Sequence, residues 1–203
     1  MATERTPMAD DGIPQLTPVE QERWTAMQSA IDAAAHALTS PTADGDELQA
    51  AVNQIQAIDL DMGRVRDSLH IPDDAGDDAA ALEAVLRRIP PGWGRWISCK
   101  AGWYQLIIRT DRELAAIDPD YTVHQIKEKW SVLEYYAHTT KGASVEVAMK
   151  AVTDRAREES EHTCELCGGP GNECSNFDYI KTLCVECAAR TGYCTAPRPT
   201  TEH

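Results

Sequence analysis

Four cysteines near the end of the chain have the types and the spacing of a metal site. Cys164 and Cys167 form one Cys-x-x-Cys pair, and after sixteen intervening residues Cys184 and Cys187 form a second. Each pair places two thiolates on one tight turn, and two pairs together close a tetrahedral shell that has no open position. The sequence therefore predicts a structural zinc site formed by these four residues. Iron is the alternative ion, because four thiolates also suit it.

The other candidate ligands near this site are expected to have no role in it. Cys174 and Cys194 flank the second pair and are expected to be free thiols, with a redox pair or a second ligand set as the alternative. Cys99 is expected in the core, and His162 on the surface. Nucleases with a treble-clef metal module need additional His and acidic side chains around a divalent ion. No His lies between the two cysteine pairs, so the module is expected to be structural or protein-binding.

The charge of the chain argues against nucleic acid as the expected partner. The net charge is −14, and residues 1–90 hold 17 acidic but only 6 basic side chains, whereas residues 91–160 hold 10 of each. A nucleic-acid binder needs a basic footprint for the phosphates. We expect the acidic half to be a solvated surface, or a face that docks a basic protein partner or mimics nucleic acid.

The sequence predicts a cytoplasmic protein. No apolar run reaches the ~20 residues that a membrane span requires, and residues 1–15 lack the basic start and apolar stretch of a secretory signal. In a reducing compartment, clustered cysteines more often indicate a metal than disulfides.

The N-terminal half, residues 17–90, is expected to form an acidic helical region between a disordered tail, residues 1–16, and the rest of the chain. A capping box at residues 17–20 starts a helix with an apolar stripe, and a second apolar helix is expected from residue 44 to residue 69. The two helices should pair as an antiparallel hairpin, whose seam could also extend into a homodimer. The stripe of the first helix comprises Trp24, Met27, Ile31, Ala34 and Leu38.

Residues 91–160 are expected to form an α+β core, followed by a metal module at residues 161–195 and a disordered tail at 196–203. A helix is predicted over residues 102–117, a β-hairpin over 121–138 and a long helix over 144–160. The fold class is therefore α+β and mostly helical, with an N-terminal helical hairpin, a small antiparallel sheet and a C-terminal zinc ribbon or treble clef.

No catalytic constellation is evident in the sequence. The predicted hairpin places Lys127 and Lys129 on one face and Glu128 on the other, and such polar faces are usually solvent-exposed. The alternative is that the lysines bind an acidic ligand. A nucleophile elbow and a phosphate-binding glycine loop are both missing, so we favour a protein that is not an enzyme.

Several short sequence motifs together resemble those of an uncharacterised family of small bacterial and bacteriophage proteins, over about residues 99–190. In that family a GWY helix precedes a hairpin of the form QxKEKxxxLxxY, and a final helix leads into a cysteine zinc finger. The resemblance implies this fold and zinc, but no established activity. The chain departs from the family at Ser131, Glu134 and Cys187, where Gly, Arg and often His are found. The motifs that carry the resemblance are Gly102-Trp103-Tyr104, Asp118-Pro119-Asp120-Tyr121, Gln125-Ile126-Lys127-Glu128-Lys129-Trp130, Leu133-Glu134-Tyr135-Tyr136, and residues 160–168 with 182–184.

These observations favour a zinc-stabilised interaction protein whose acidic helical region binds another protein. It would act as a regulator, as an immunity or antitoxin partner, or as a counter-defence factor. One alternative is a nucleic-acid-associated transcriptional regulator that uses the zinc module. Another is an enzyme whose site lies between the hairpin and residues 93–103, lined by Lys127, Lys129 and Tyr135.

Overall fold

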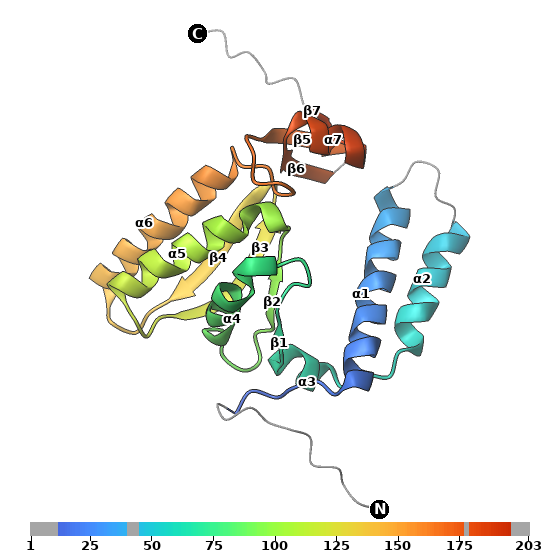
Figure 1. Ribbon diagram of the computed structural model, residues 1–203, viewed down its shortest axis with the longest axis horizontal. Coiled ribbons are helices and arrows are strands. Elements are labelled where there is room, and N and C mark those ends of the chain that lie inside the picture. The colour runs from blue at the N-terminus through green and yellow to red at the C-terminus, as the bar shows by residue number, and fades with distance from the viewer. Residues whose placement is uncertain (1–11, 40–44, 177–178, 196–203) are drawn as a thin grey trace, which may run out of the picture. The chain divides into compact units, whose positions relative to one another are not determined.

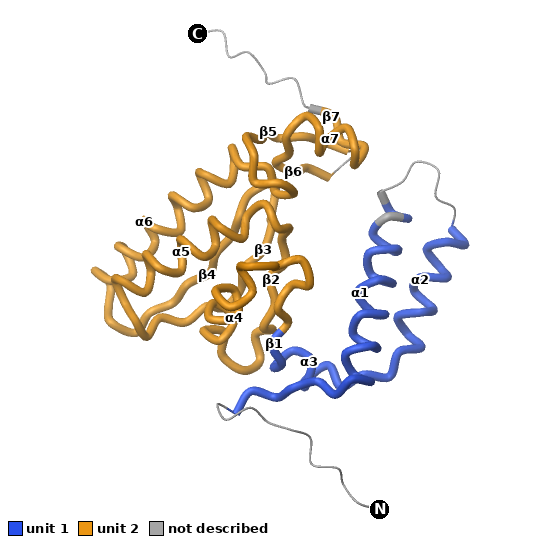
Figure 2. Tube along the Cα trace, in the orientation of Figure 1, with its two compact units in different colours: residues 1–69 blue, residues 70–203 orange. Residues whose placement is uncertain are grey.

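The chain forms two compact units, residues 1–69 and residues 70–203 (Figure 2). A computed structural model describes residues 12–39, 45–176 and 179–195 (Figure 1). Residues 1–11 of the tail expected at residues 1–16, and the tail expected at 196–203, lie outside these ranges. Every described helix is too short or too polar to cross a lipid bilayer.

The first unit is a helical hairpin. Its helices are α1 (Pro18–Thr39), α2 (Gly45–Ala57) and the short α3 (Met62–Asp67), and α1 and α2 lie side by side, as predicted (Figure 1). The predicted capping box is present: the amide of Thr17 donates to Glu20 Oε2 at 2.7 Å, and the amide of Glu20 donates to Thr17 Oγ1 at 3.3 Å. These bonds satisfy two backbone donors that the first turn of α1 leaves free.

The second predicted helix is interrupted, so the expectation of one helix over residues 44–69 is wrong. The chain leaves the helix after Ala57, and Asp61 begins α3 as its N-cap. The Asp61 carboxylate accepts hydrogen bonds from the amides of Gly63 and Arg64 at 2.9 and 3.1 Å. The apolar spacing continues through the break, which is why periodicity alone does not reveal it.

The buried face of α1 differs from the predicted stripe. Trp24, Met27 and Ala30 are buried, whereas Ile31 and Leu38 are 47% and 61% exposed. The apolar cluster of this unit joins Trp24 and Met27 to Val65 of α3, with Leu16 packed against it. Residue 16 therefore belongs to the folded unit, and the expected disordered tail is too long at its C-terminal end.

The second unit contains a four-stranded sheet in the order β1-β2-β3-β4. Strand β2 pairs with β3 in parallel and β3 pairs with β4 as the predicted antiparallel hairpin. The sheet is thus mixed, whereas only antiparallel pairing was expected. The strands are β1 (Leu69–His70), β2 (Arg95–Ser98), β3 (Thr122–Lys129) and β4 (Val132–His138).

Helix α4 (Ala79–Arg87) packs on β2, α6 (Ala143–Ser160) packs on β4, and α5 (Tyr104–Ile117) packs on both of these helices. Short 3-10 turns, Gly76–Asp78 and Ala101–Trp103, precede α4 and α5. Because α4 packs on α5 and β2, it belongs to the second unit, and the boundary expected after residue 90 falls instead after residue 69. The fully buried side chains of this core include Leu82, Leu86, Ile89, Trp103, Ile107, Leu114, Ile126 and Leu133.

The C-terminal module consists of a small sheet and one helix. Strands β5 (Asn172–Asn176), β6 (Tyr179–Leu183) and β7 (Cys194–Thr195) form a sheet in the order β6-β5-β7, and α7 (Val185–Thr191) follows β6. Strands β5 and β6 between the cysteine pairs and the helix after them give the arrangement of a treble clef, which was one of the two expected module types, rather than of a flat ribbon.

Candidate metal centre

The fold brings the four predicted cysteines together. The sulfurs of Cys164, Cys167, Cys184 and Cys187 all lie within 4.8 Å of one another, and those of Cys167 and Cys184 are 3.7 Å apart. Cys164 and Cys187 are buried, whereas Cys167 is exposed. Four sulfur donors at this spacing can hold a metal ion, because tetrahedral thiolate sites bring their sulfurs to similar separations.

The first pair lies on a tight turn that its glycines allow. The amide of Gly168 donates to the carbonyl of Cys164 at 2.9 Å, and the amide of Cys164 donates to the carbonyl of Gly169 at 2.7 Å. Gly168 has a φ of +75°, in the left-handed region that favours glycine. The tight turn expected for the first pair is therefore present.

The second pair lies at the start of α7. Cys184 is the N-cap of this helix, and its sulfur accepts a hydrogen bond from the amide of Cys187 at 3.4 Å. That hydrogen bond is the main cause that lowers the pKa of Cys184 to about 7. Arg190 lies 3.6 Å from the sulfur of Cys187. The first contact favours the thiolate form of Cys184 that a metal requires, whereas the neighbouring Cys184 sulfur and burial raise the pKa of Cys187 to about 12.

A backbone contact joins the first cysteine turn to the start of α5. The amide of Gly102 donates to the carbonyl of Glu165 at 2.8 Å, and the indole of Trp103 donates to the carbonyl of Thr163 at 2.7 Å. A Cβ at position 102 would lie 2.6 Å from the Glu165 carbonyl and 2.5 Å from the Gly168 nitrogen, and closer still to the Cys164 carbonyl. Only glycine fits there, which gives the Gly-Trp-Tyr motif a structural role.

A buried ion pair within the metal module lies beside the same junction. Glu165 is 1% exposed, and its carboxylate lies 2.5 Å from Lys181 Nζ of β6. Its other oxygen accepts from the amide of Lys100 at 3.2 Å. Desolvation lowers the pKa of Lys181, but the neighbouring carboxylates outweigh it and the net pKa is raised, so the lysine stays charged.

A second contact joins the module to the β3–β4 turn. The Thr182 hydroxyl donates to the carbonyl of Ser131 at 2.7 Å, and both residues are buried. Trp130 and Ser131 form the turn with φ values of 54° and 64°. The metal module is therefore held to the core at two places far apart in sequence.

The remaining candidate ligands lie outside the sulfur cluster. Cys99 is buried, as expected, and burial raises the pKa of its thiol far above the usual range. Cys174 is buried in the apolar cluster of the module, and its thiol lies 3.4 Å from the carbonyl of Asn172. Cys194 is exposed, and His162 is not one of the clustered residues.

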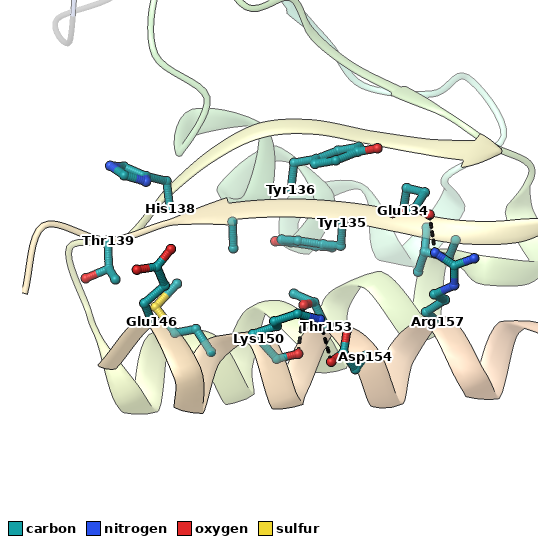
Figure 3. Close-up of a pocket in the computed structure, with 13 residues that line it drawn as sticks. Glu134, Tyr135, Tyr136, His138, Thr139, Glu146, Lys150, Thr153, Asp154 and Arg157 are labelled. Atoms are coloured by element: carbon teal, nitrogen blue, oxygen red, sulfur yellow. Dashed lines mark hydrogen bonds and ion pairs between the residues drawn. The ribbon is translucent and has the colours of Figure 1, made fainter. Parts of the chain in front are cut away.

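The hairpin lysines do not come together with Tyr135. Lys127 Nζ lies 5.5 Å from the ring centre of Tyr136, on the face of the sheet opposite to Tyr135. Tyr135 lines a groove between β4 and α6, whose lining includes neither Lys127 nor Lys129 (Figure 3). Its hydroxyl is 2.8 Å from that of Tyr121, which donates to Asp111 at 2.6 Å.

The described geometry thus supports one chemical assignment, a four-cysteine site that could hold a metal ion. Comparison with protein-family models, with curated proteins and with solved structures finds no match for this chain.

Proposed function

We propose that this protein is a zinc-stabilised interaction protein that binds a protein partner through its N-terminal helical unit. The resemblance to a bacterial and bacteriophage family suggests the biological setting, namely a regulator, an immunity or antitoxin partner, or a counter-defence factor.

Zinc is the proposed ion because the donor set consists of four cysteines in a closed shell. Zn²⁺ prefers four-coordinate tetrahedral thiolate sites when its role is structural. When bound, it would hold the two cysteine pairs together and thereby stabilise the fold of the module. The residues that would hold it are Cys164, Cys167, Cys184 and Cys187.

The observation that carries the interaction proposal is an exposed apolar seam on α1. Ile31 and Leu38 are seven residues apart, so they lie on one face of the helix, and they are 47% and 61% exposed. Asp32, next to Ile31, is exposed as well. Apolar anchors with a charged rim are typical of protein interfaces.

The charge of this unit indicates the kind of partner. Residues 1–69 contain 12 acidic and 4 basic side chains. A partner with an apolar stripe flanked by Lys or Arg would match both the seam and the charge. A second copy of this acidic unit would bring like charges together, so a different, basic protein is the favoured partner.

The test is affinity capture with the full-length protein from cells that express it naturally. The double variant Ile31→Asp/Leu38→Asp should lose a specific partner that the unaltered protein retains. Val147→Asp is the matched control, because Val147 is also an exposed apolar helix residue, at 70%, but lies on α6.

The result has two contrary outcomes. A partner that all three proteins capture equally would place the interface elsewhere. If no partner is captured, and sizing shows the same monomer for all three proteins, the proposal is wrong.

A further inference from the structure

The outer edge of β4 presents backbone groups that no described strand covers. Strand β4 is the last in its sheet, and Lys129 and Val132 are partners on either side of a two-residue turn. Such a turn is closed by a hydrogen-bonded pair, and inward-bonding residues then alternate along the strand. The register shift between Val123 and Gln125 adds a residue to β3 and none to β4, so the alternation along β4 continues. Glu134 and Tyr136 therefore bond toward β3, whereas the backbone groups of Leu133, Tyr135 and Ala137 point outward.

One contact agrees with this alternation. The amide of Leu133 donates to the Ser160 hydroxyl of α6 at 2.8 Å, which is a bond on the outer side of β4. The end of the edge nearest the turn is thus closed by the protein itself. The outward groups of Tyr135 and Ala137 lie further along, where β4 and α6 border a groove.

The groove has a volume of about 350 Å³ and runs between the edge strand and α6 (Figure 3). Tyr135 points from the strand toward the helix, and Thr153 and Lys150 lie on the helix below it (Figure 3). A strand edge beside a helix is a setting in which folded domains accept an extended peptide as an added strand. The lining is mixed, and its apolar residues include Met149 and Ala137.

The charges of the groove indicate what such a peptide would carry. Glu134 pairs with Arg157 at 2.5 Å, and Asp154 pairs with Lys150 at 2.6 Å. Glu146 also lines the groove, and among the described residues it has no basic partner within ion-pair distance. Its carboxylate lies between α6 and β4 near Thr139 (Figure 3). A cation on the peptide would complete this third pair.

We propose that an extended segment of another protein adds as a strand to the outer edge of β4 at residues 135–137, with a Lys or Arg side chain at Glu146. Backbone hydrogen bonds to Tyr135 and Ala137 hold the segment, and Glu146 selects its charge. The site lies in the second unit and is independent of the proposed interface on α1, so either proposal can fail without the other.

The experiment selects binders from a displayed library of random decapeptides against the full-length, zinc-loaded protein. The strongest peptides are then labelled, and their affinities are measured by fluorescence anisotropy. They should be rich in β-branched residues and carry a Lys or Arg that cannot be replaced by Glu. Ala137→Pro, which removes an outward amide, and Glu146→Lys should each weaken binding by about tenfold or more, a change of about 1.4 kcal/mol.

Glu158→Lys is the matched control, because it makes the same charge change at an exposed position of α6 that does not line the groove. The dissociation constant of this variant should change by less than about twofold, well below the tenfold change expected for Glu146→Lys. Peptides that bind the Pro and Glu146→Lys variants as well as the unaltered protein would overturn the proposal.

Two further measurements keep the test decisive. If Ala137→Pro unfolds the sheet, NMR of the unaltered protein takes the place of that variant. The amide resonances of Tyr135 and Ala137 should shift when the peptide is added. Resonances that do not shift would overturn the proposal. Sedimentation equilibrium tests whether a second copy of this chain occupies the edge. If the unaltered protein dimerises and the Ala137→Arg variant does not, the occupant is a second copy, and the proposal of a different protein is wrong.

Discussion

The amide of Gly102 donates to the carbonyl of Glu165 at 2.8 Å, which brings the backbone at the start of α5 against the first cysteine turn. This contact explains why a glycine precedes the buried Trp103. It also means that the metal module is part of the core of the second unit rather than an appendage.

Gly102→Ala should destabilise the protein and loosen the metal module. The added methyl group would meet backbone atoms of the cysteine turn, and overpacking of this kind costs about 1–3 kcal/mol. The unfolding temperature should fall, and zinc should transfer faster to a chromogenic chelator. Gly45→Ala is the control, because nothing lies within 4 Å of its added Cβ. Equal zinc transfer from both variants would contradict the close packing at position 102.

Removal of the metal should unfold the C-terminal module but not the sheet. Structural zinc contributes on the order of 10 kcal/mol to the folding of such sites. After chelation, amide exchange should accelerate in residues 161–195, while β3 and β4 remain protected. The unaltered protein should contain one zinc per chain, and Cys184→Ser should contain much less.

Cys174→Ser is the control for the metal measurement, because Cys174 lies outside the sulfur cluster. It should retain one zinc per chain. Loss of zinc from this variant would show that the ligand set is wrong.

Glu165→Gln should destabilise the protein by leaving Lys181 without its closest carboxylate. Breaking a fully buried ion pair costs about 3–5 kcal/mol of unfolding free energy. The loss here should lie at or below the lower end of that range, because the Lys181 side chain is 26% exposed. Urea unfolding measures the loss. The double variant Glu165→Gln/Lys181→Met should recover part of it, and a double variant less stable than the single one would contradict the pairing.

The stability that Asp118 provides should disappear in acid. Its carboxylate lies 2.6 Å from Lys141 Nζ and accepts from Thr139 Oγ1 at 2.5 Å, and these bonds lower its pKa to about 2. A lowered folded-state pKa adds stability above the unfolded value, about 4, and this stability is lost as the pH falls through the folded value.

The measurement compares the unaltered protein with Asp118→Asn by urea unfolding at several pH values. The difference in unfolding free energy should be constant above about pH 4 and should shrink between about pH 4 and pH 2. A difference that does not depend on pH would show that the charge of Asp118 is not what stabilises the fold.

Local sequence signals predicted much of the fold and the four cysteines that lie together. Cys-x-x-Cys pairs confine their ligands to short turns, so the partners of Cys164 and Cys187 follow from spacing. The capping box at Thr17 and Glu20 and the β3–β4 hairpin are equally local. Within each cysteine pair and within the capping box the interacting groups are only a few residues apart, and β3 and β4 are joined by a two-residue turn.

The features that the sequence did not predict depend on distant contacts or on single caps. Strand β2 has only four residues, too few for a clear alternation, and its parallel pairing with β3 spans the whole of α5. The break before α3 depends on one carboxylate, that of Asp61. The role of Gly102 was not evident either, because the residues it contacts lie more than sixty positions later.

The hydrogen bond from Thr182 to the Ser131 carbonyl ties the metal module to the register of a hairpin some fifty residues earlier. A one-residue slip between β3 and β4 would move this carbonyl by about 3.3 Å and turn Ile126 or Leu133 away from the core. The module could not then keep both its Thr182 bond to the hairpin and its contact with Gly102. Docking of the module therefore favours the sheet in which β3 and β4 have this register, because only that register brings the Ser131 carbonyl to Thr182.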